Sequence, residues 1–307
     1  MTAVVELKNV TKTIRGRKII DDLSFEVEAG EVFGFLGPNG AGKTTTIRMI
    51  VGLIGMTSGE IAICGKSIRK DYEGAISRVG AIVENPELYK FLTGYQNLQQ
   101  AARLTKAITK EKIDEAVSLV GLTERIHDKV KTYSLGMRQR LGIAQSLLHD
   151  PKVLILDEPT NGLDPAGIRE IRDYLRNLAT EKNLAIIVSS HLLSEMEMMC
   201  DRFAIIQKGK LVNVQSIASE EVASDKKTYY CDVDNWNEAL KLLARHGIQG
   251  YKHEKGIRIL LETCQIPDVL RLLIDHDLLV FEITPVKKSL EERFLEMTNT
   301  PEVASNV

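Results

Sequence analysis

The sequence contains no long hydrophobic run, since no stretch approaches the roughly 18 uninterrupted apolar residues that a transmembrane helix requires. Residues 1–12 alternate apolar and polar side chains and lack the hydrophobic core of a signal peptide. We therefore expect that this chain does not span a bilayer. If it acts at a membrane, another chain must supply the membrane-spanning part.

Cysteine is scarce, and neither sign of charge dominates. The four cysteines lie far apart and form no C-x-x-C pair: Cys64, Cys200, Cys231 and Cys264. We expect them to be buried thiols in a reducing cytosol. The formal net charge is −2. This gives no electrostatic case for a nucleic acid as the main ligand, and we expect no nucleic-acid partner.

The chain has 307 residues, enough for two domains, and its 44% apolar and 27% charged residues are typical of a globular protein. Up to about residue 214, apolar strand-like runs alternate with helical patterns, which predicts a mostly parallel sheet covered by helices. Residues 153–156 and 184–188 are typical of central strands, because they are apolar on both faces. The periodicity of residues 86–150 is mainly helical.

A polar, charged stretch at residues 216–228 indicates a linker between a first domain, 1–215, and a second domain, 229–307. The second domain has the order strand, helix, strand, strand, helix, strand, which predicts a small α+β ferredoxin-like fold. We expect these elements at residues 229–234, 236–247, 250–253, 257–261, 267–273 and 279–284. A capping box at residues 289–292 then predicts a last helix.

The most informative segment is residues 37–44, which read Gly-Pro-Asn-Gly-Ala-Gly-Lys-Thr. They match the phosphate-binding template of Gly, four residues and Gly-Lys-Ser/Thr. The glycines let backbone N–H groups cradle phosphate oxygens, while Lys43 reaches the β and γ phosphates and Thr44 offers a hydroxyl to Mg²⁺. The flanking residues predict a buried strand at 32–36 and a helix at 45–53, whose N-terminus faces the phosphates. The residues expected to contact the nucleotide here are Gly37, Pro38, Asn39, Gly40, Ala41, Gly42, Lys43, Thr44 and Thr45.

Residues 154–158, Leu-Ile-Leu-Asp-Glu, form an apolar strand that ends in two carboxylates. Asp157 at such a strand end can hold Mg²⁺, usually through water. Glu158 can polarise the water that attacks the γ-phosphate. Taken alone, the segment also fits an acidic turn after a buried strand, but its combination with the phosphate loop favours a nucleotide hydrolase.

Residues 133–139, Tyr-Ser-Leu-Gly-Met-Arg-Gln, resemble the Leu-Ser-Gly-Gly-Gln signature of the ATP-binding-cassette (ABC) ATPases, and Ser134 and Gly136 match it. Ser134 is also predicted to cap a helix, whose free N–H groups and dipole suit a γ-phosphate. A D-loop at residues 159–164 and an H-loop at residues 189–191 follow in the family's order. The resemblance covers about residues 4–214.

The resemblance gives roles to three further residues. In the family, a histidine at the position of His191 contacts the γ-phosphate and links Glu158 to the D-loop of the other subunit. Ile14 stands where the family stacks an aromatic ring on adenine. Because a base–aromatic stack contributes ~1–3 kcal/mol, we expect GTP to compete within about tenfold of ATP. Glu84 replaces the Q-loop glutamine and places a carboxylate near Mg²⁺ and the triphosphate, as in the "E-loop" of exporters that confer bacitracin or lantibiotic resistance.

The resemblance implies an α/β fold, a P-loop NTPase of the ABC type. Its nucleotide-binding domain has a parallel sheet core, an antiparallel β subdomain and a helical subdomain, and the α+β domain would serve an accessory or dimerisation role. Residues 289–295, near the C-terminus, resemble the ending of ATPase subunits that serve type-2 ABC exporters.

The implied function is the ATP-hydrolysing subunit of a bacterial ABC exporter, with ATP and Mg²⁺ as cofactors. Two copies would bind ATP head to tail, each site joining one copy's phosphate loop to residues 134–136 of the other. A separate membrane permease would hold the protein at the cytoplasmic face of the membrane and would choose the cargo, which this chain does not specify. A soluble ABC ATPase without a channel, of the scaffold or cluster-assembly type, is the alternative.

Overall fold

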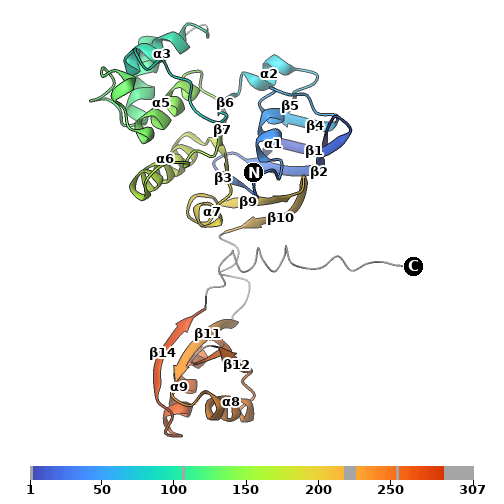
Figure 1. Cartoon of the computed structure of the whole chain (residues 1–307), viewed down its shortest axis with the longest axis vertical. Helices are drawn as coiled ribbons and strands as arrows, with labels where there is room; N and C mark the ends of the chain where they lie inside the picture. The colour runs from blue at the N-terminus through green and yellow to red at the C-terminus, as the bar shows by residue number, and fades with distance from the viewer. Residues whose placement is uncertain (1–2, 106–107, 218–225, 254–255, 287–307) are drawn as a thin grey trace. The chain divides into compact units, whose positions relative to one another are not determined.

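The computed structural model of the protein describes residues 3–105, 108–217, 226–253 and 256–286. The chain divides into two compact units, Met1–Ile217 and Ala218–Val307 (Figure 1). Among the residues that the structure describes, none of the helices combines the length and the apolar character that crossing a bilayer requires.

The first unit is built on a mostly parallel sheet with the strand order β10-β9-β3-β8-β7-β6, in which β10 runs antiparallel to β9. The strands are β3 (Val32–Leu36), β6 (Val79–Ile82), β7 (Val153–Asp157), β8 (Ala185–Ser190), β9 (Arg202–Gln207) and β10 (Lys210–Ser216). Every residue of β3, β7 and β8 is buried, as expected of parallel strands covered on both faces. Because β3, β8 and β7 are parallel neighbours, the loops that follow them meet at one edge of the sheet. The mostly parallel α/β fold is therefore confirmed.

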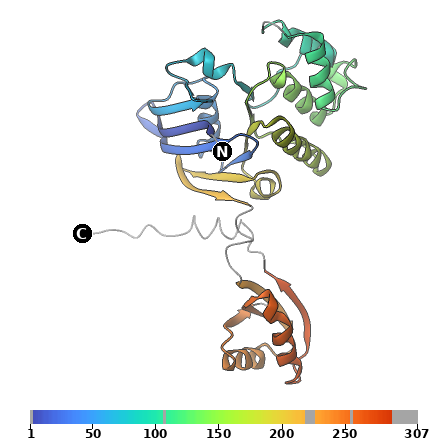
Figure 2. The ribbon, with the colours of Figure 1, turned by 180° about the vertical axis from the view of Figure 1, so that it is seen from behind.

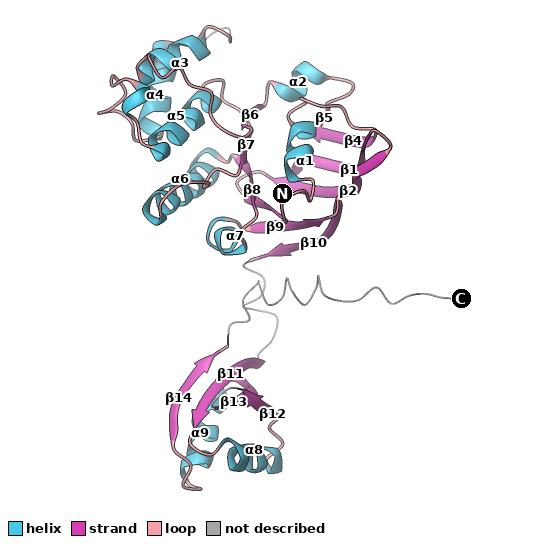
Figure 3. Cartoon of the chain, in the orientation of Figure 1, coloured by secondary structure: helices cyan, strands magenta, loops and turns pink. Residues whose placement is uncertain are grey.

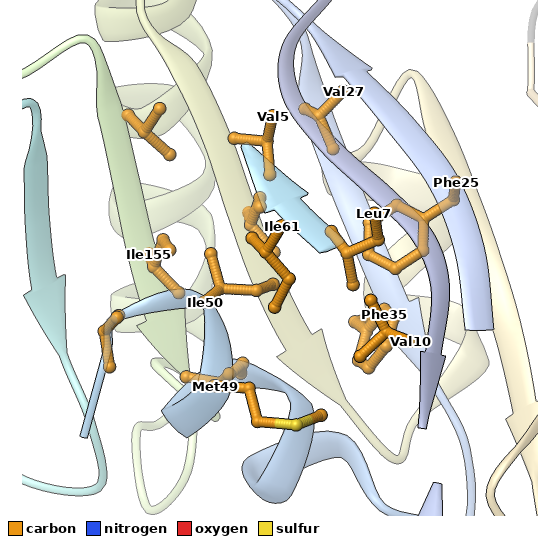
Figure 4. Close-up of a cluster of buried hydrophobic side chains, with 14 of the residues drawn as sticks. Val5, Leu7, Val10, Phe25, Val27, Phe35, Met49, Ile50, Ile61 and Ile155 are labelled. Carbon is orange, nitrogen blue, oxygen red and sulfur yellow. The ribbon is translucent and has the colours of Figure 1, made fainter. Parts of the chain in front are cut away.

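An antiparallel sheet with the order β2-β1-β4-β5 packs beside this core. Its strands are β1 (Ala3–Ile14), β2 (Arg17–Glu28), β4 (Ser58–Ile63) and β5 (Lys66–Ser67). Figure 4 shows how side chains of this sheet, such as Leu7 and Ile61, meet Ile50 of helix α1 (Lys43–Ile50) and Phe35 of β3 in one buried cluster. Helix α1 begins two residues before the predicted start and ends three residues before the predicted end, because Lys43 already has helical geometry. The cluster fixes α1 against both sheets.

The remaining helices of the first unit cover the parallel sheet, gather in a separate helical group or, in the case of α2, lie against β4 and β5 (Figure 3). They are α2 (Tyr72–Ile76), α3 (Gly94–Ala102), α4 (Lys110–Leu119), α5 (Leu135–Leu147), α6 (Pro165–Lys182), α7 (Leu193–Met199) and the 3₁₀ turn η1 (Val130–Thr132). Helices α3, α4 and α5 contact one another and stand apart from the antiparallel sheet, as the view from behind in Figure 2 also shows. Residues 86–93 lie before α3 and are not helical, so the helical prediction for 86–150 extended too far.

Several helices begin at side chains that cap their free N–H groups, and α3, α5 and α6 are examples. Thr93 forms a capping box with Gln96 at the start of α3. Ser134 accepts a hydrogen bond from the backbone N–H of Met137 at 3.2 Å and so begins α5. Asp164 does the same for α6. Such caps contribute about 0.5–2 kcal/mol each and fix where a helix starts.

The second unit is an antiparallel sheet with the order β12-β13-β11-β14 and two helices on one face. Its elements are β11 (Lys226–Val233), α8 (Trp236–Arg245), β12 (Gly250–His253), β13 (Gly256–Glu262), the 3₁₀ turn η3 (Thr263–Gln265), α9 (Ile266–Ile274) and β14 (Val280–Pro285). This order is that of the predicted ferredoxin-like fold. Strand β10 ends at Ser216 and β11 begins at Lys226, so both ends of the predicted linker belong to strands. The helix predicted after residue 289 lies outside the described residues.

The cysteines divide into two kinds. Cys200 and Cys231 are buried free thiols, as expected, and burial raises the pKa of the Cys231 thiol to about 11. Cys64 and Cys264 are exposed, which corrects the expectation that all four would be buried. Cys64 lies in the turn between β4 and β5, and Cys264 lies in η3, where apolar patterning gives no guide to burial.

Candidate nucleotide site

The phosphate loop connects the end of β3 to the start of α1, and its glycines are required by the space around them. A Cβ on Gly37 would lie 2.4 Å from the backbone oxygen of Ile206. A Cβ on Gly42 would lie 2.4 Å from Cδ1 of Ile20, and the φ of Gly42 is +110°. Because such contacts and such a φ exclude a side chain, both positions need glycine. The loop is thus held tightly between β9 and β2.

Lys43 is the buried cation of this site. Its side chain is 6% exposed, and Nζ donates a hydrogen bond to the carbonyl oxygen of Gly37 at 2.7 Å. The same Nζ lies 3.4 Å from Oε1 of Glu158. The ammonium group is therefore placed between the phosphate loop and the carboxylate that the sequence predicts to polarise water.

The two acidic residues at the end of β7 are held by a serine on the neighbouring strand. Oγ of Ser189 donates to Oδ1 of Asp157 at 2.6 Å and accepts from the backbone N–H of Glu158 at 2.9 Å. Glu158 has a φ of +51°, a left-handed conformation that is uncommon for a residue with a Cβ. Its Oε2 lies 3.0 Å from Nδ1 of His191, which follows β8. Glu158 thus contacts both Lys43 and His191.

A pocket of about 390 Å³ opens where these groups meet. It is lined by the phosphate-loop residues Pro38, Asn39, Gly40, Gly42, Lys43, Thr44 and Thr45, together with Glu158 and His191. Two further lining residues, Ile19 and Asn161, had not been predicted. Asn161 could have been suspected, since it lies three residues after Glu158. Ile19 reaches the pocket from β2, and no local motif points to it.

The oxygen groups near the pocket suit Mg²⁺ bound together with a nucleotide. The structure, over its described residues, contains no group of three or more His, Cys, Asp or Glu side chains that would hold a metal alone. Mg²⁺ usually keeps several waters and is held by one or two protein ligands plus phosphates. The Thr44 hydroxyl in the pocket and the 3% exposed carboxylate of Asp157 fit that pattern.

Seven predicted site residues, all within the described ranges, do not line this pocket: Gly37 and Ala41 in the phosphate loop, Asp157 at the end of β7, and Ile14, Glu84, Ser134 and Gly136. Ile14 lies at the end of β1 beside the hairpin turn and is 43% exposed. Oε1 of Glu84 lies 2.5 Å from Nη2 of Arg48 on α1. Ser134 and Gly136 occupy the start of α5, with Ser134 exposed. Their nucleotide contacts remain predictions, and the contact predicted for Ser134 and Gly136 involves a second copy.

Comparison with known proteins agrees with this geometry. Residues 20–161 match the family model described as ABC transporter. The chain is 63% identical over 298 residues to an uncharacterized ABC transporter ATP-binding protein, YhcH, of Bacillus subtilis (strain 168), with 97% of each chain covered. It is 40% identical over 301 residues to the bacitracin transport ATP-binding protein BcrA of Bacillus licheniformis, covering 97% of this chain and 98% of the relative.

Solved structures show the same fold. For the ATP binding subunit of an ABC transporter, the TM-score is 0.61 at 28% identity, covering 70% of this chain and 90% of that one. For cbiO1 of Clostridium perfringens, part of the transporter complex cbiONQ, the TM-score is 0.67 at 25% identity, covering 80% and 98%. The protein belongs to the ATP-binding proteins of ABC transporters. It is an ATP-binding ATPase of that family, as the sequence predicted.

Proposed function

We propose that the protein is the ATP-hydrolysing subunit of a bacterial exporter that removes a peptide antibiotic or a drug through a separate membrane permease. The observation that carries this proposal is the extent of the similarity to BcrA. It covers 97% of this chain, so it runs through the second unit as well as the ATPase unit. A further relative, 33% identical over 307 residues, is the linearmycin resistance ATP-binding protein LnrL of Bacillus subtilis (strain 168). Proteins named for transport and resistance do not favour the channel-free alternative.

In the proposed reaction, the phosphate-loop N–H groups and Lys43 orient the β and γ phosphates. Thr44 and Asp157 hold Mg²⁺, which neutralises charge on the phosphates when it is bound. Glu158 polarises the attacking water. His191 holds Glu158 through Nδ1 at 3.0 Å and leaves Nε2 available to the γ-phosphate. The adjacency of Lys43, Glu158 and His191 in one pocket supports these roles.

We infer that two copies complete each other's sites. Ser134 is exposed at the N-terminus of α5, where free N–H groups and the helix dipole attract an anion. ATP held by one copy's phosphate loop would then contact residues 134–136 of the other. The second unit is proposed to assist this self-association or the assembly with the permease. Contact with the permease would place the protein at the cytoplasmic face of the membrane.

An exposed aromatic pair supports a permease contact near Glu84. Tyr89 and Phe91 are 56% and 69% exposed, and their ring centroids are 5.8 Å apart. Exposed aromatic side chains of this kind are enriched at protein interfaces. They follow Glu84 closely in the sequence, so this segment can link events at the nucleotide to a docked partner.

A resistance assay tests the exporter proposal. The protein is expressed in a sensitive host together with a candidate membrane permease from the same organism, and the minimal inhibitory concentrations of bacitracin, a lantibiotic and linearmycin are measured. We expect the pair to protect against at least one compound, and protection to disappear when either subunit is omitted. A pair that assembles and hydrolyses ATP but protects against none of them would contradict the antibiotic-export proposal. Failure to co-purify with the permease would favour a channel-free ATPase.

Replacing Glu84 by Gln should alter coupling to the permease more than basal hydrolysis. Glu84 is 64% exposed and paired with Arg48, and exposed pairs contribute about 0.2–1 kcal/mol, so folding should be unaffected. The measurements are the basal ATPase rate of the isolated subunit and the transport-linked rate of the complex. Glu181→Gln, at an exposed position near the end of α6, is the control. A complex unchanged by Glu84→Gln would make this glutamate a neutral variant.

A further inference from the structure

A buried glutamate outside the pocket joins the two loops that carry Glu158 and His191. Glu195 lies on α7 and is 8% exposed. Its Oε2 accepts a hydrogen bond from Oγ1 of Thr160 at 2.8 Å and another from Oγ of Ser190 at 2.7 Å. Thr160 is two residues after Glu158, and Ser190 directly precedes His191. One carboxylate oxygen therefore connects the turn after β7 to the end of β8.

The bridge is buried and well satisfied. Thr160 and Ser190 are 3% and 1% exposed, so water does not compete for their hydroxyl groups. Oγ of Ser190 donates to Glu195 and also accepts from the backbone N–H of Leu192 at 3.0 Å. The two O···O distances, 2.8 and 2.7 Å, are those of well-formed O–H···O hydrogen bonds. The bridge therefore fixes the positions of both hydroxyl-bearing residues.

The position of the bridge relative to the pocket suggests its purpose. Ser189 already ties the two strand ends together at Asp157 and at the backbone of Glu158. Glu195 adds a second connection through Thr160, which follows Glu158 in the turn where Glu158 takes its left-handed conformation. A residue in that conformation persists where its surroundings enforce it. With a tie on each side, the Glu158 carboxylate can keep its 3.0 Å contact with His191.

We propose that Glu195 is a positioning residue for ATP hydrolysis, which holds Glu158 and His191 in register through Thr160 and Ser190. It does not line the pocket and is not expected to touch the nucleotide. Its loss should therefore slow the hydrolysis step and leave nucleotide binding largely unchanged. This inference rests on the proposed role of Glu158.

The first test is Glu195→Met, which keeps a long buried side chain but removes the acceptor. In the full-length protein, we expect kcat for ATP hydrolysis to fall at least about tenfold while KM stays within about threefold, since small misplacements of reacting groups are that costly. Glu195→Gln keeps an acceptor oxygen for both hydroxyl groups and should retain kcat within about threefold of wild type. Ser194→Ala, at the exposed neighbouring position on α7, is the control and should change neither constant.

Thr160→Val is a second test of the proposal. Valine has nearly the same shape as threonine but no hydroxyl group, so Glu195 loses the hydrogen bond from residue 160 and keeps the one from Ser190. Thr160→Val should also lower kcat. The double variant with Glu195→Met should be no slower than Glu195→Met alone, since both substitutions break the same contact. This variant carries the test if Glu195→Met does not fold. The proposal would be overturned if Thr160→Val left kcat unchanged, or if it raised KM without lowering kcat.

Glu158→Gln is measured in parallel, so that the two possible failures can be told apart. If Glu158→Gln retains turnover, the role proposed for Glu158 is wrong. If Glu158→Gln abolishes turnover while Glu195→Met and Thr160→Val remain as active as wild type, the role of Glu158 stands and the positioning role of Glu195 is wrong.

Discussion

Replacing Glu158 by Gln is expected to reduce ATP turnover by ~10²–10⁴-fold while ATP binding is retained, because that is the usual contribution of a general base. The amide has nearly the same size and can still contact His191, but it cannot draw a proton from the attacking water. Lys43 keeps its 2.7 Å hydrogen bond to Gly37, so the phosphate loop should stay intact. The variant should accumulate as an ATP-bound dimer.

The measurements for Glu158→Gln are the steady-state ATPase rate, the affinity for ATP, and the mass of the protein in solution with and without ATP. Glu170→Gln, on the exposed face of α6, is the matched control and should behave as wild type. Turnover within about threefold of wild type would mean that water polarisation by Glu158 is not a main contribution, given the usual size of general-base effects.

Replacing Lys43 by Met is expected to weaken ATP binding by about 10- to 100-fold, because hydrogen bonds to charged groups contribute roughly 1.5–3 kcal/mol each. Methionine keeps the length of the side chain but carries no charge for the phosphates. It also leaves Glu158 without the ammonium group that now lies 3.4 Å away. Hydrolysis should therefore remain slow even at saturating ATP.

Binding of a fluorescent ATP analogue measures the effect of Lys43→Met, and a thermal unfolding scan checks that the protein is folded. Lys110→Met is the control, since Lys110 is exposed at the start of α4, in the helical group. A folded Lys43→Met protein that binds ATP as tightly as wild type would mean that the phosphates do not lie in the loop.

Much of the fold and part of the site could be predicted because the signals are local. The phosphate loop is contiguous, and its glycines meet a steric requirement that the structure shows directly at Gly37 and Gly42. The strand that ends in Asp157 is apolar on both faces, which is typical of a central parallel strand. In the second unit, clean alternation along residues 229–234 predicted β11 correctly because one face of that strand is buried.

What could not be predicted depends on contacts between distant segments. The contact between Glu158 and His191 could be expected only from the family resemblance, because it depends on β7 and β8 being neighbours in the sheet and local sequence does not specify strand order. The ion pair between Arg48 and Glu84 joins α1 to the loop after β6, and no periodicity indicates it. The start of α1 was misplaced because the loop and the helix share Lys43, where turn and helix signals overlap.

Position 158 must meet two conflicting requirements, one from its left-handed backbone conformation and one from the reaction. A turn with a φ of +51° is adopted most readily by glycine or asparagine, whereas the reaction needs a carboxylate. The chain keeps the carboxylate and supports the turn from outside, through Ser189 at the backbone N–H and through the N–H of Asn161, which donates to the carbonyl oxygen of Glu158 at 3.2 Å. Some of the stabilising contacts at this edge of the sheet therefore compensate for a residue whose side chain disfavours its left-handed backbone conformation. Position 158 is thus a point where selection for a more stable protein and selection for a faster ATPase would favour different amino acids.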